Sequence, residues 1–437
     1  MKYLGGIRVE RLLKSSKLGI FKNRDFMLLL CGQLASNIAN AVHSAAVAWF
    51  IMSTVGESNS GKYIAILGAC NIIPYIVFGP IAGVFVDKFD RKKIIYGTDY
   101  ARGSLFLILA LLTYFDFYPM VSLFVITTIG ALLGSLFNPA IDASVPNVVS
   151  EKDLTQANSL NGISRQLTWV IGAAISGFLY YHIGIIGVFI FDGICFILSA
   201  ISEMFIRLPA RKTEVEVGIK EVSKTFWIDF KGGISFIVKQ KSIMIMLGFS
   251  LFLNFIFSPL FSIVLPKVVK FTLGMTAKEY GIMEAVFPIG SIIGMAIVSI
   301  MSENKNWFKI VIFSLIVQCA LIILYGIPIL PSVYGKLTNN TIFIIFCIIG
   351  LILTTFNALV NVPIFTAFQK LVPDEYRGRF FGVMNTATQG IVPVGLAVMG
   401  IISDKFDPSI IFIVSGILCV LMSVSMLFVP ELKDIKY

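Results

Sequence analysis

The sequence contains little charge. Only 14% of its 437 residues are charged, whereas soluble domains carry roughly 25%. Apolar residues make up 57% of the chain, and the mean hydropathy is +0.88. These values exclude an ordinary soluble globular protein and predict that most of the chain lies in a lipid bilayer.

The sequence also lacks the residue groups that hold metals or build disulfide frameworks. It has six cysteines, all inside apolar runs and none in a CxxC pair, so they are interpreted as packing residues. The two histidines, His43 and His182, are too few and too far apart for a histidine-based metal site. No GxxxxGK[ST] nucleotide loop is present. We therefore expect no metal, no cofactor and no ATP-driven mechanism.

The net charge of +10 has two interpretations. Basic proteins can bind nucleic acid, but the sequence contains no nucleic-acid-binding motif. Membrane proteins collect Lys and Arg in their cytoplasmic loops, which is the favoured interpretation here. No nucleic-acid partner is expected.

Apolar runs separated by charged or Pro/Gly/Asn-rich segments predict twelve membrane-spanning helices, because an open sheet edge is not stable in lipid. The expected fold class is all-α integral membrane, with twelve transmembrane helices in two six-helix bundles. The predicted spans are 26–52, 62–86, 94–115, 119–140, 157–181, 184–206, 242–266, 279–301, 308–330, 341–364, 380–403 and 408–430. The expected organisation is a cytoplasmic segment 1–24, a bundle 25–206, a linker 207–241, a bundle 242–430 and a tail 431–437.

The distribution of Lys and Arg predicts the orientation. The N-terminal segment, the turn at 87–93 and the linker are basic, so these regions and both termini are expected in the cytoplasm. Lys267, Lys270 and Lys278 lie on the opposite side and count against this bias locally. The first apolar run is too long for a cleaved signal sequence and predicts an uncleaved membrane anchor.

The two halves of the chain are related by a shift of 223 positions. Under this shift Asn138 aligns with Asn361 and Gln166 with Gln389. The other aligned pairs are Val149/Val372, Glu151/Asp374, Gly172/Gly395, Gly177/Gly400 and Gly193/Gly416. Parallel six-helix repeats are typical of transporters that bind substrate between their two halves.

The stretch GPIAGVFVDKFDRKKI, residues 79–94, concentrates six charges within the seven positions 87–93, between the second and third predicted helices. Its Gly83-x-x-x-Asp87-Lys88-x-x-Arg91-Lys92 pattern resembles the loop signature of the major facilitator superfamily. Asp90 replaces the Gly that is usual there, and the ending resembles the macrolide-efflux and siderophore-exporter branch. The patterns Asp99-x-x-Arg102, Asn138-Pro139-Ala140, Val149-x-x-x-x-Leu154-x-x-Ala157-Asn158 and Pro373-x-x-x-Arg377-Gly378-Arg379 are also similar to that branch.

The resemblance implies a latch that closes the cytoplasmic side in the outward-open state. Gly83 would permit close helix contact, with Lys88 and Lys92 in the same turn. Asp87 is expected at the start of the eleventh helix, near Phe380. Arg91 is expected to pair with Asp142. The alternative interpretation is a basic loop that only sets topology.

Polar residues recur at helical spacing inside several predicted spans. The first span carries Gln33, Asn37, Asn40 and Ser44, the seventh Ser250, Asn254 and Ser258, and the tenth and eleventh Thr354, Asn357, Asn361, Asn385 and Gln389. Intramembrane polar groups face protein or water by default. From these and Arg165 we predict a substrate cavity lined by Asn37, Asn40, Arg165, Asn254, Asn357, Asn361 and Gln389. Interhelical hydrogen bonding is the alternative role for each Asn.

Two acidic residues inside the spans are candidates for proton coupling. Glu284 lies in the eighth span before Phe287 and Pro288, and Asp192 lies near the expected outer end of the sixth. A buried acid is uncharged more readily than an exposed one, so it can carry a proton. Arg165 is a candidate counter-charge for Glu284 across the cavity. The alternatives are an interfacial position for Glu284 and a helix-start acid for Asp192.

Together these features predict a secondary active exporter of amphipathic small molecules, such as a macrolide-like drug, working by alternating access with proton antiport. A siderophore or lipid-like metabolite transporter on the same fold is the alternative. An intramembrane enzyme is disfavoured because the histidines have no catalytic neighbours, so no enzymatic activity is expected. The expected partners are a small substrate, the proton and the lipid bilayer. The protein is expected to be a monomer in a bacterial inner or plasma membrane.

Overall fold

The computed structural model describes residues 20–150, 153–208, 219–301 and 307–430, and every regular element in these ranges is a helix. The first half comprises η1 (Ile20–Lys22), α2 (Arg24–Val55), α3 (Glu57–Lys88), α4 (Arg91–Tyr114), α5 (Pro119–Val148) and α6 (Leu154–Met204). Helix α7 (Ile219–Lys239) follows, within the predicted linker. The second half comprises α8 (Lys241–Pro259), η3 (Leu260–Val264), α9 (Leu265–Lys267), η4 (Val268–Thr272), α10 (Ala277–Ile300), α11 (Trp307–Gly326), η5 (Ile327–Ile329), α12 (Asn339–Leu371), α13 (Asp374–Ser403), α14 (Pro408–Ser425) and η6 (Met426–Phe428).

Eleven helical segments of the described chain are long and apolar enough to span a membrane. One of them, Gln156–Met204, has 49 residues and is interrupted at Gly184, where φ is 64° and ψ is −172°. Glycine occupies this conformation without the steric cost that a Cβ would impose. The segment therefore contains two spans, which gives the twelve crossings that the apolar runs predict.

Short polar side chains begin several of the helices. Asn23 accepts a hydrogen bond from the backbone N–H of Phe26 at 3.1 Å, and Asp90 accepts one from Lys92 at 3.0 Å. Such caps satisfy backbone donors that have no partner within the helix. Asp90, which stands where the resembled signature has Gly, is thus the N-cap of α4.

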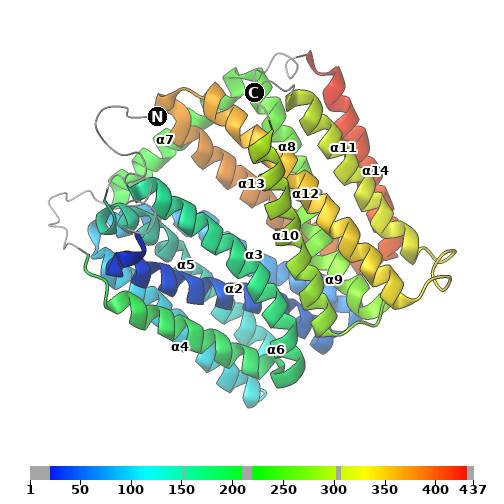
Figure 1. Ribbon diagram of the computed structural model, residues 1–437, viewed down its shortest axis with the longest axis horizontal. Helices are drawn as coiled ribbons and strands as arrows, with labels where there is room; N and C mark the ends of the chain where they lie inside the picture. Colours follow the sequence, from blue (N-terminus) through cyan, green and yellow to red (C-terminus); the bar gives the residue numbers. More distant parts are fainter. Residues whose placement is uncertain (1–19, 151–152, 209–218, 302–306, 431–437) are drawn as a thin grey trace, which may run out of the picture.

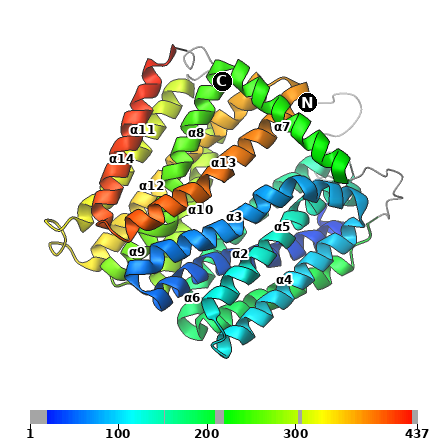
Figure 2. The ribbon, with the colours of Figure 1, turned by 180° about the vertical axis from the view of Figure 1, so that it is seen from behind.

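The structure consists of two bundles of helices set at an angle, with α7 lying across one end (Figures 1 and 2). We call the end that carries α7 the linker end and the other end the closed end. Helix α7 docks on the start of α13, where Phe236 stacks on Tyr376 with ring centroids 5.0 Å apart. Part of the predicted linker is therefore an ordered helix that contacts the second bundle.

Small residues bring the two halves into contact at the closed end. A Cβ on Gly177 of α6 would overlap the Ala277 carbonyl of α10, and one on Gly281 would lie 2.8 Å from the Ala173 carbonyl. In α3 and α13, Gly61 and Gly400 pack on each other's backbone in the same way.

Toward the linker end the inter-half contacts of α3 and α13 weaken. A Cβ on Gly390 of α13 would meet only Cδ1 of Ile76 in α3, at 3.9 Å, and nothing lies within 4 Å of a Cβ on Gly79 or Gly382. The halves therefore meet at the closed end and diverge toward the linker end.

Glycines related by the 223-residue shift make equivalent contacts. Gly172 of α6 packs against the backbone of Ile38 in α2, and its counterpart Gly395 of α13 packs against the Phe255 carbonyl in α8. Since α2 begins the first half and α8 begins the second, the same helix pair is joined by the same kind of residue in both halves.

Candidate functional site

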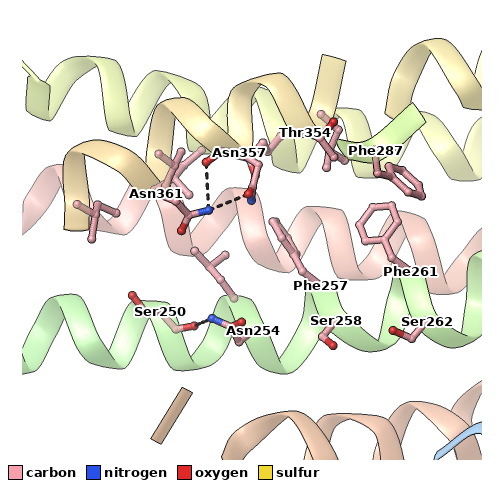
Figure 3. Close-up of a pocket in the computed structure, with 16 residues that line it drawn as sticks. Ser250, Asn254, Phe257, Ser258, Phe261, Ser262, Phe287, Thr354, Asn357 and Asn361 are labelled. Carbon is pink, nitrogen blue, oxygen red and sulfur yellow. Dashed lines mark hydrogen bonds between the residues drawn. The ribbon is translucent and has the colours of Figure 1, made fainter. Parts of the chain in front are cut away.

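A cavity of about 400 Å³ lies among the helices of the second half (Figure 3). Its volume falls within the range of sites for small organic ligands. All of its described lining residues belong to the segment from α8 to η3 and to α10, α11 and α12. They are Ser250, Leu253, Asn254, Phe257, Ser258, Phe261, Ser262, Phe287, Leu315, Gln318, Leu353, Thr354, Asn357, Val360, Asn361 and Ile364.

One wall of this cavity is a chain of amide groups. The Asn361 side-chain N–H₂ donates to Oδ1 of Asn357 at 2.7 Å, and the Asn357 amide donates to Oε1 of Gln318 at 3.2 Å. Across the space, Asn254 donates to the Ser250 carbonyl at 2.9 Å. The amides thus hold one another in place while keeping further acceptors and donors for a ligand.

Another part of the cavity lining is apolar and consists of aromatic rings. Phe261 and Phe287 meet edge to face with centroids 5.7 Å apart, and Phe257 lies beside them in Figure 3. The cavity therefore offers an apolar surface next to fixed amides, and none of its described lining residues is charged.

A second hollow of about 460 Å³ adjoins the first and shares Ser250, Asn254, Asn361 and Ile364 with it. Helix α13 contributes Met384, Thr388 and Gln389 to its wall. The amide-lined space thus continues between α8, α12 and α13. Four of the predicted cavity residues, Asn254, Asn357, Asn361 and Gln389, line this continuous space.

The three predicted cavity residues from the first half are not among the residues that line these two hollows. Asn40 accepts a hydrogen bond from Arg102 at 2.7 Å inside the first bundle, and Asn37 lies one turn before it on α2. Arg165 is 3.2 Å from Asp142 at an exposed position. Spacing identifies a polar face of a helix but not the neighbour that this face meets, so a cavity role for these three residues stays a prediction.

Arg91 and Asp142 each make a described contact other than the one expected between them. Arg91 donates to the carbonyl of Ala143 at 2.8 Å, whereas the carboxylate of Asp142 pairs with Arg165. Arg165 is therefore the partner of Asp142 and not the counter-charge of Glu284. The surroundings of Gly83 and the side chains of Asp87 and Lys88 lie outside the described part of the structure, and Lys92 occupies the first turn of α4.

The two candidate proton carriers lie in different halves. Glu284 lies on α10, one turn after Tyr280, and is not among the cavity residues. Asp192 is fully buried, and its Oδ2 is 3.1 Å from Nδ1 of His43. Asp192 is eight residues beyond Gly184, so the helix-start interpretation of this acid is wrong.

The family model of the Major Facilitator Superfamily matches residues 29–395 and 337–436 of the chain. The chain belongs to the Major Facilitator Superfamily. This is a family of transporters, and the long apolar helices make the protein a multi-pass membrane protein.

Two curated relatives cover nearly the whole chain. Macrolide efflux protein A of Streptococcus pyogenes is 21% identical over 94% of this chain and 97% of the relative. The staphyloferrin A transporter of Staphylococcus aureus is 22% identical over 91% of this chain and 94% of the relative. Both relatives are similar to this chain at low identity.

Solved structures of other superfamily members share the fold. A bacterial homologue of the iron transporter ferroportin in its inward-facing state aligns with a TM-score of 0.68, at 12% identity and over 92% of this chain and 98% of the other. The outward-facing state of such a homologue aligns with a TM-score of 0.54 over the same shares. Both likenesses concern the fold of the chain.

The closed end contains an ion pair that the sequence did not predict. Nζ of Lys267 is 2.7 Å from Oδ1 of Asp404, and both side chains are at most 4% exposed. The carboxylate of Asp404 also accepts from the backbone N–H groups of Gly61 at 3.1 Å and Lys62 at 3.3 Å. Helices from both halves therefore converge on one buried carboxylate.

A second basic residue joins the halves at this end. Lys270 donates to the Trp49 carbonyl at 3.2 Å and to the hydroxyl of Ser53, both on α2. Trp49 in turn stacks on Tyr280 of α10 with centroids 5.5 Å apart. Lys267 and Lys270 were counted only as exceptions to the charge bias, and no sequence signal indicated that they join the halves.

Proposed function

We propose that the protein is a secondary active exporter of amphipathic small molecules, such as macrolide-like drugs, and that it works by alternating access with proton antiport. The observation that carries this proposal is the cavity of fixed amides beside aromatic rings. Such a lining binds a molecule with an apolar body and scattered polar groups. The relative that is a macrolide efflux protein supports the same substrate class.

The absence of charge from the described cavity walls bears on the alternative substrate. A siderophore that carries several carboxylates would be held by basic side chains, and the described lining residues of both hollows include none. A neutral or singly charged amphipathic molecule is the better match.

We further propose that the linker end faces the cytoplasm of a bacterial cell, with both chain termini on that side, and that the protein acts as a monomer in the inner membrane. The basic residues of the 87–93 turn and of the linker support this orientation. With this orientation, the diverging linker end makes the structure inward-open. The cavity is then loaded from the cytoplasm, as an exporter requires.

In the opposite state the linker end must close. We propose that Gly83, Asp87, Lys88 and Lys92 form the latch in that state, as the signature implies. The Asp87→Asn variant should insert normally and lose transport. Transport at the wild-type rate would show that the turn only sets topology.

The exporter is tested by drug susceptibility and by cell-associated erythromycin in a deletion strain that expresses the protein. Expression should lower the cell-associated drug, and collapse of the proton gradient should restore it. Asn357→Leu removes an amide from the cavity wall and should raise the half-saturating drug concentration by about tenfold, because a buried donor and acceptor are lost. Asn340→Leu, an exposed position on the same helix, is the matched control. Unchanged drug accumulation on expression of the wild type would refute the proposed function.

A further inference from the structure

A cluster of buried charged side chains lies inside the first half, away from the amide-lined cavity. Helix α4 contributes Asp99 and Arg102, α6 contributes Asp192 and Glu203, and α2 contributes His43. All three carboxyl groups belong to residues with no exposed surface. Burial of this many charged groups in a membrane protein is costly and is typical of functional positions.

The guanidinium of Arg102 is held by several fixed contacts. One nitrogen donates to Asn40 at 2.7 Å, another lies 3.7 Å from Oδ1 of Asp99, and the central carbon is 4.2 Å from the ring centre of Phe196. These contacts keep one permanent positive charge beside Asp99.

The acidic groups, in contrast, have few hydrogen-bond donors, since only Oδ2 of Asp192 (with His43) and Oε1 of Glu203 (with Ser199) have a partner. Neither oxygen of Asp99 accepts a hydrogen bond, and Oδ1 of Asp192 and Oε2 of Glu203 accept none either. The hydroxyl of Ser36 donates to the Gln33 carbonyl at 3.4 Å. The hydroxyl of Ser199 donates to the Gly32 carbonyl at 2.8 Å and lies 3.4 Å from Oε1 of Glu203. An ionised carboxylate buried without donors is strongly destabilised.

The charge balance of the cluster also indicates that the three acids are not all ionised. Three buried acids face one permanent cation, Arg102, and one imidazole, His43. If all three acids were ionised, a negative charge would remain unpaired even with His43 protonated, and an unpaired buried charge is costly. The described groups are balanced when at least one carboxyl carries a proton.

Two other ionisable side chains border the cluster. The thiol of Cys195 is on α6, three residues after Asp192. The hydroxyl of Tyr75 on α3 and the guanidinium of Arg102 both lie against Gly134 of α5. Neither neighbour adds a positive charge, so the balance of the cluster is unchanged.

Glycines shape the space around the acids. A Cβ on Gly32 would lie 3.0 Å from both Cγ and Oε1 of Glu203. Gly103 and Gly193, each next to a member of the cluster, bring α4 and α6 together, since a Cβ on either would lie about 3 Å from the other's carbonyl oxygen. The polar cluster is therefore a built site and not a loose group of acids.

Helix α2 connects this site to the contact between the halves. Asn40 and His43 meet the cluster, and Trp49, two turns further on, contacts Lys270 and Tyr280 of the second half. Glu203 lies at the other side of the cluster, one residue before α6 ends at the linker end. A change in the protonation of the acids thus acts on a helix that joins both halves.

We propose that Asp99, Asp192 and Glu203, grouped around Arg102, are the proton-binding site of the transporter, reached from the linker end through Glu203. This proposal rests on the proposed proton antiport and gives it a location in the first half, separate from the substrate cavity. The proton is bound by a carboxylate to give a neutral carboxyl group and leaves when that group ionises. A metal cation is a poorer occupant, because Arg102 already places a positive charge beside Asp99.

The first test needs no substrate. Infrared difference spectra of the full-length protein in lipid nanodiscs are recorded as the pH is changed, and the C=O stretch of protonated carboxyl groups is followed. Wild-type protein should show this band, and Glu203→Gln and Asp99→Asn should each remove part of it. Asp142→Asn, which changes an exposed carboxylate, should leave it intact. If the band is insensitive to Asp99, Asp192 and Glu203 and disappears in Glu284→Gln, the proposal is wrong.

The second test measures coupling in proteoliposomes with erythromycin. Glu203→Gln should lower the accumulation of the drug that a pH gradient drives by about 5- to 150-fold, the usual span of coupling between two ligand sites. Drug-for-drug exchange should continue. Replacing Na⁺ by choline should change neither activity of the wild type. Loss of exchange together with gradient-driven transport, in a variant that denatures at the wild-type temperature, would argue against a separate proton site.

The two tests distinguish the proposals from each other. If wild-type protein does not move erythromycin in response to a pH gradient, the proposed function is refuted. The infrared band still decides in that case whether the cluster binds protons.

Discussion

Removal of the Lys267 ammonium should open the closed end. In the structure this group is 2.7 Å from the Asp404 carboxylate and donates to the Ser403 carbonyl at the same distance. The Lys267→Met variant keeps most of the side-chain volume and leaves Asp404 buried with only the N–H groups of Gly61 and Lys62. Breaking a buried ion pair by removing one partner costs about 3–5 kcal/mol.

This cost applies to the closed conformation only, because opening lets water reach Asp404. The two remaining backbone donors favour the lower figure, about 3 kcal/mol, which corresponds to a roughly 100-fold rise in the ratio of open to closed molecules at this end. Lys405→Met, next to Asp404 but exposed, is the control and should leave the ratio unchanged.

The ratio is measured from the distance between spin labels at Ser58 and Phe406, one in each half and both exposed at this end, after replacement of the native cysteines. Lys267→Met should shift the distribution to longer distances. The double variant Lys267→Met/Asp404→Asn should shift it much less, because replacing both members of a buried pair is often nearly neutral. A distribution in Lys267→Met that matches the wild type would refute the assignment of this pair as the contact that keeps the end closed.

Three further predictions follow from the packing and the cavity. Leucine at Gly177 should overlap the Ala277 backbone, open the closed end and reduce transport, as seen by the same label distances; a cost of about 1–3 kcal/mol is expected for overpacking. Alanine at Gly184 should lower the thermal denaturation temperature in detergent, since a Cβ at positive φ costs about 1–2 kcal/mol; an unchanged temperature would contradict the assigned turn. Asn254→Leu should weaken erythromycin binding by about tenfold in a fluorescence titration, through loss of a buried polar partner, whereas Asn147→Leu, an exposed position outside both hollows, should not.

The sequence was most informative where one physical constraint dominates. Apolar runs must be helical in lipid, and for that reason the predicted span 94–115 agrees closely with α4 at Arg91–Tyr114. The polar face of the tenth span also meets that of the seventh, since Asn357 and Asn254 line one cavity. A polar residue in a span must face protein or water, which restricts it to few positions.

Ion pairs were predicted less well, because they depend on which helices are neighbours and how each is rotated. Arg165 and Asp142 lie on α6 and α5, which follow each other in the chain, and they pair with each other. The predictions instead joined each of them to a more distant partner. Asp99 and Arg102 were noted only as a pattern, and Glu203 lies so near the end of its span that its burial was not expected.

The 223-residue shift shows how the related halves differ. Gly103 of α4 aligns with Gly326 of α11, so that Arg102 aligns with Tyr325, whose ring stacks on Phe412 and whose hydroxyl donates to the Phe346 carbonyl. The position of the buried cation in the first half is thus aromatic in the second.

The reverse holds for the cavity. Asn357 aligns with Gly134 and Asn254 with Cys31, so these two amides have no counterparts in the first half, whereas Asn361 and Gln389 align with Asn138 and Gln166. The described cavity of the second half is thus lined by neutral polar groups, whereas the buried cluster of the first half is charged. If the first half binds the proton and the second the drug, the two ligands never share a side chain. Their coupling must then pass through the contacts between the halves, through Trp49 and Lys270 on one side and Gly61 and Asp404 on the other. At a pH at which Glu203 is protonated, Glu203→Gln changes no charge, so no coupling to the proton is altered. This arrangement therefore predicts that Glu203→Gln and Asn254→Leu have additive effects on drug binding at that pH, because the two side chains share no partners. A strong departure from additivity under that condition would place the proton and the drug in a common site.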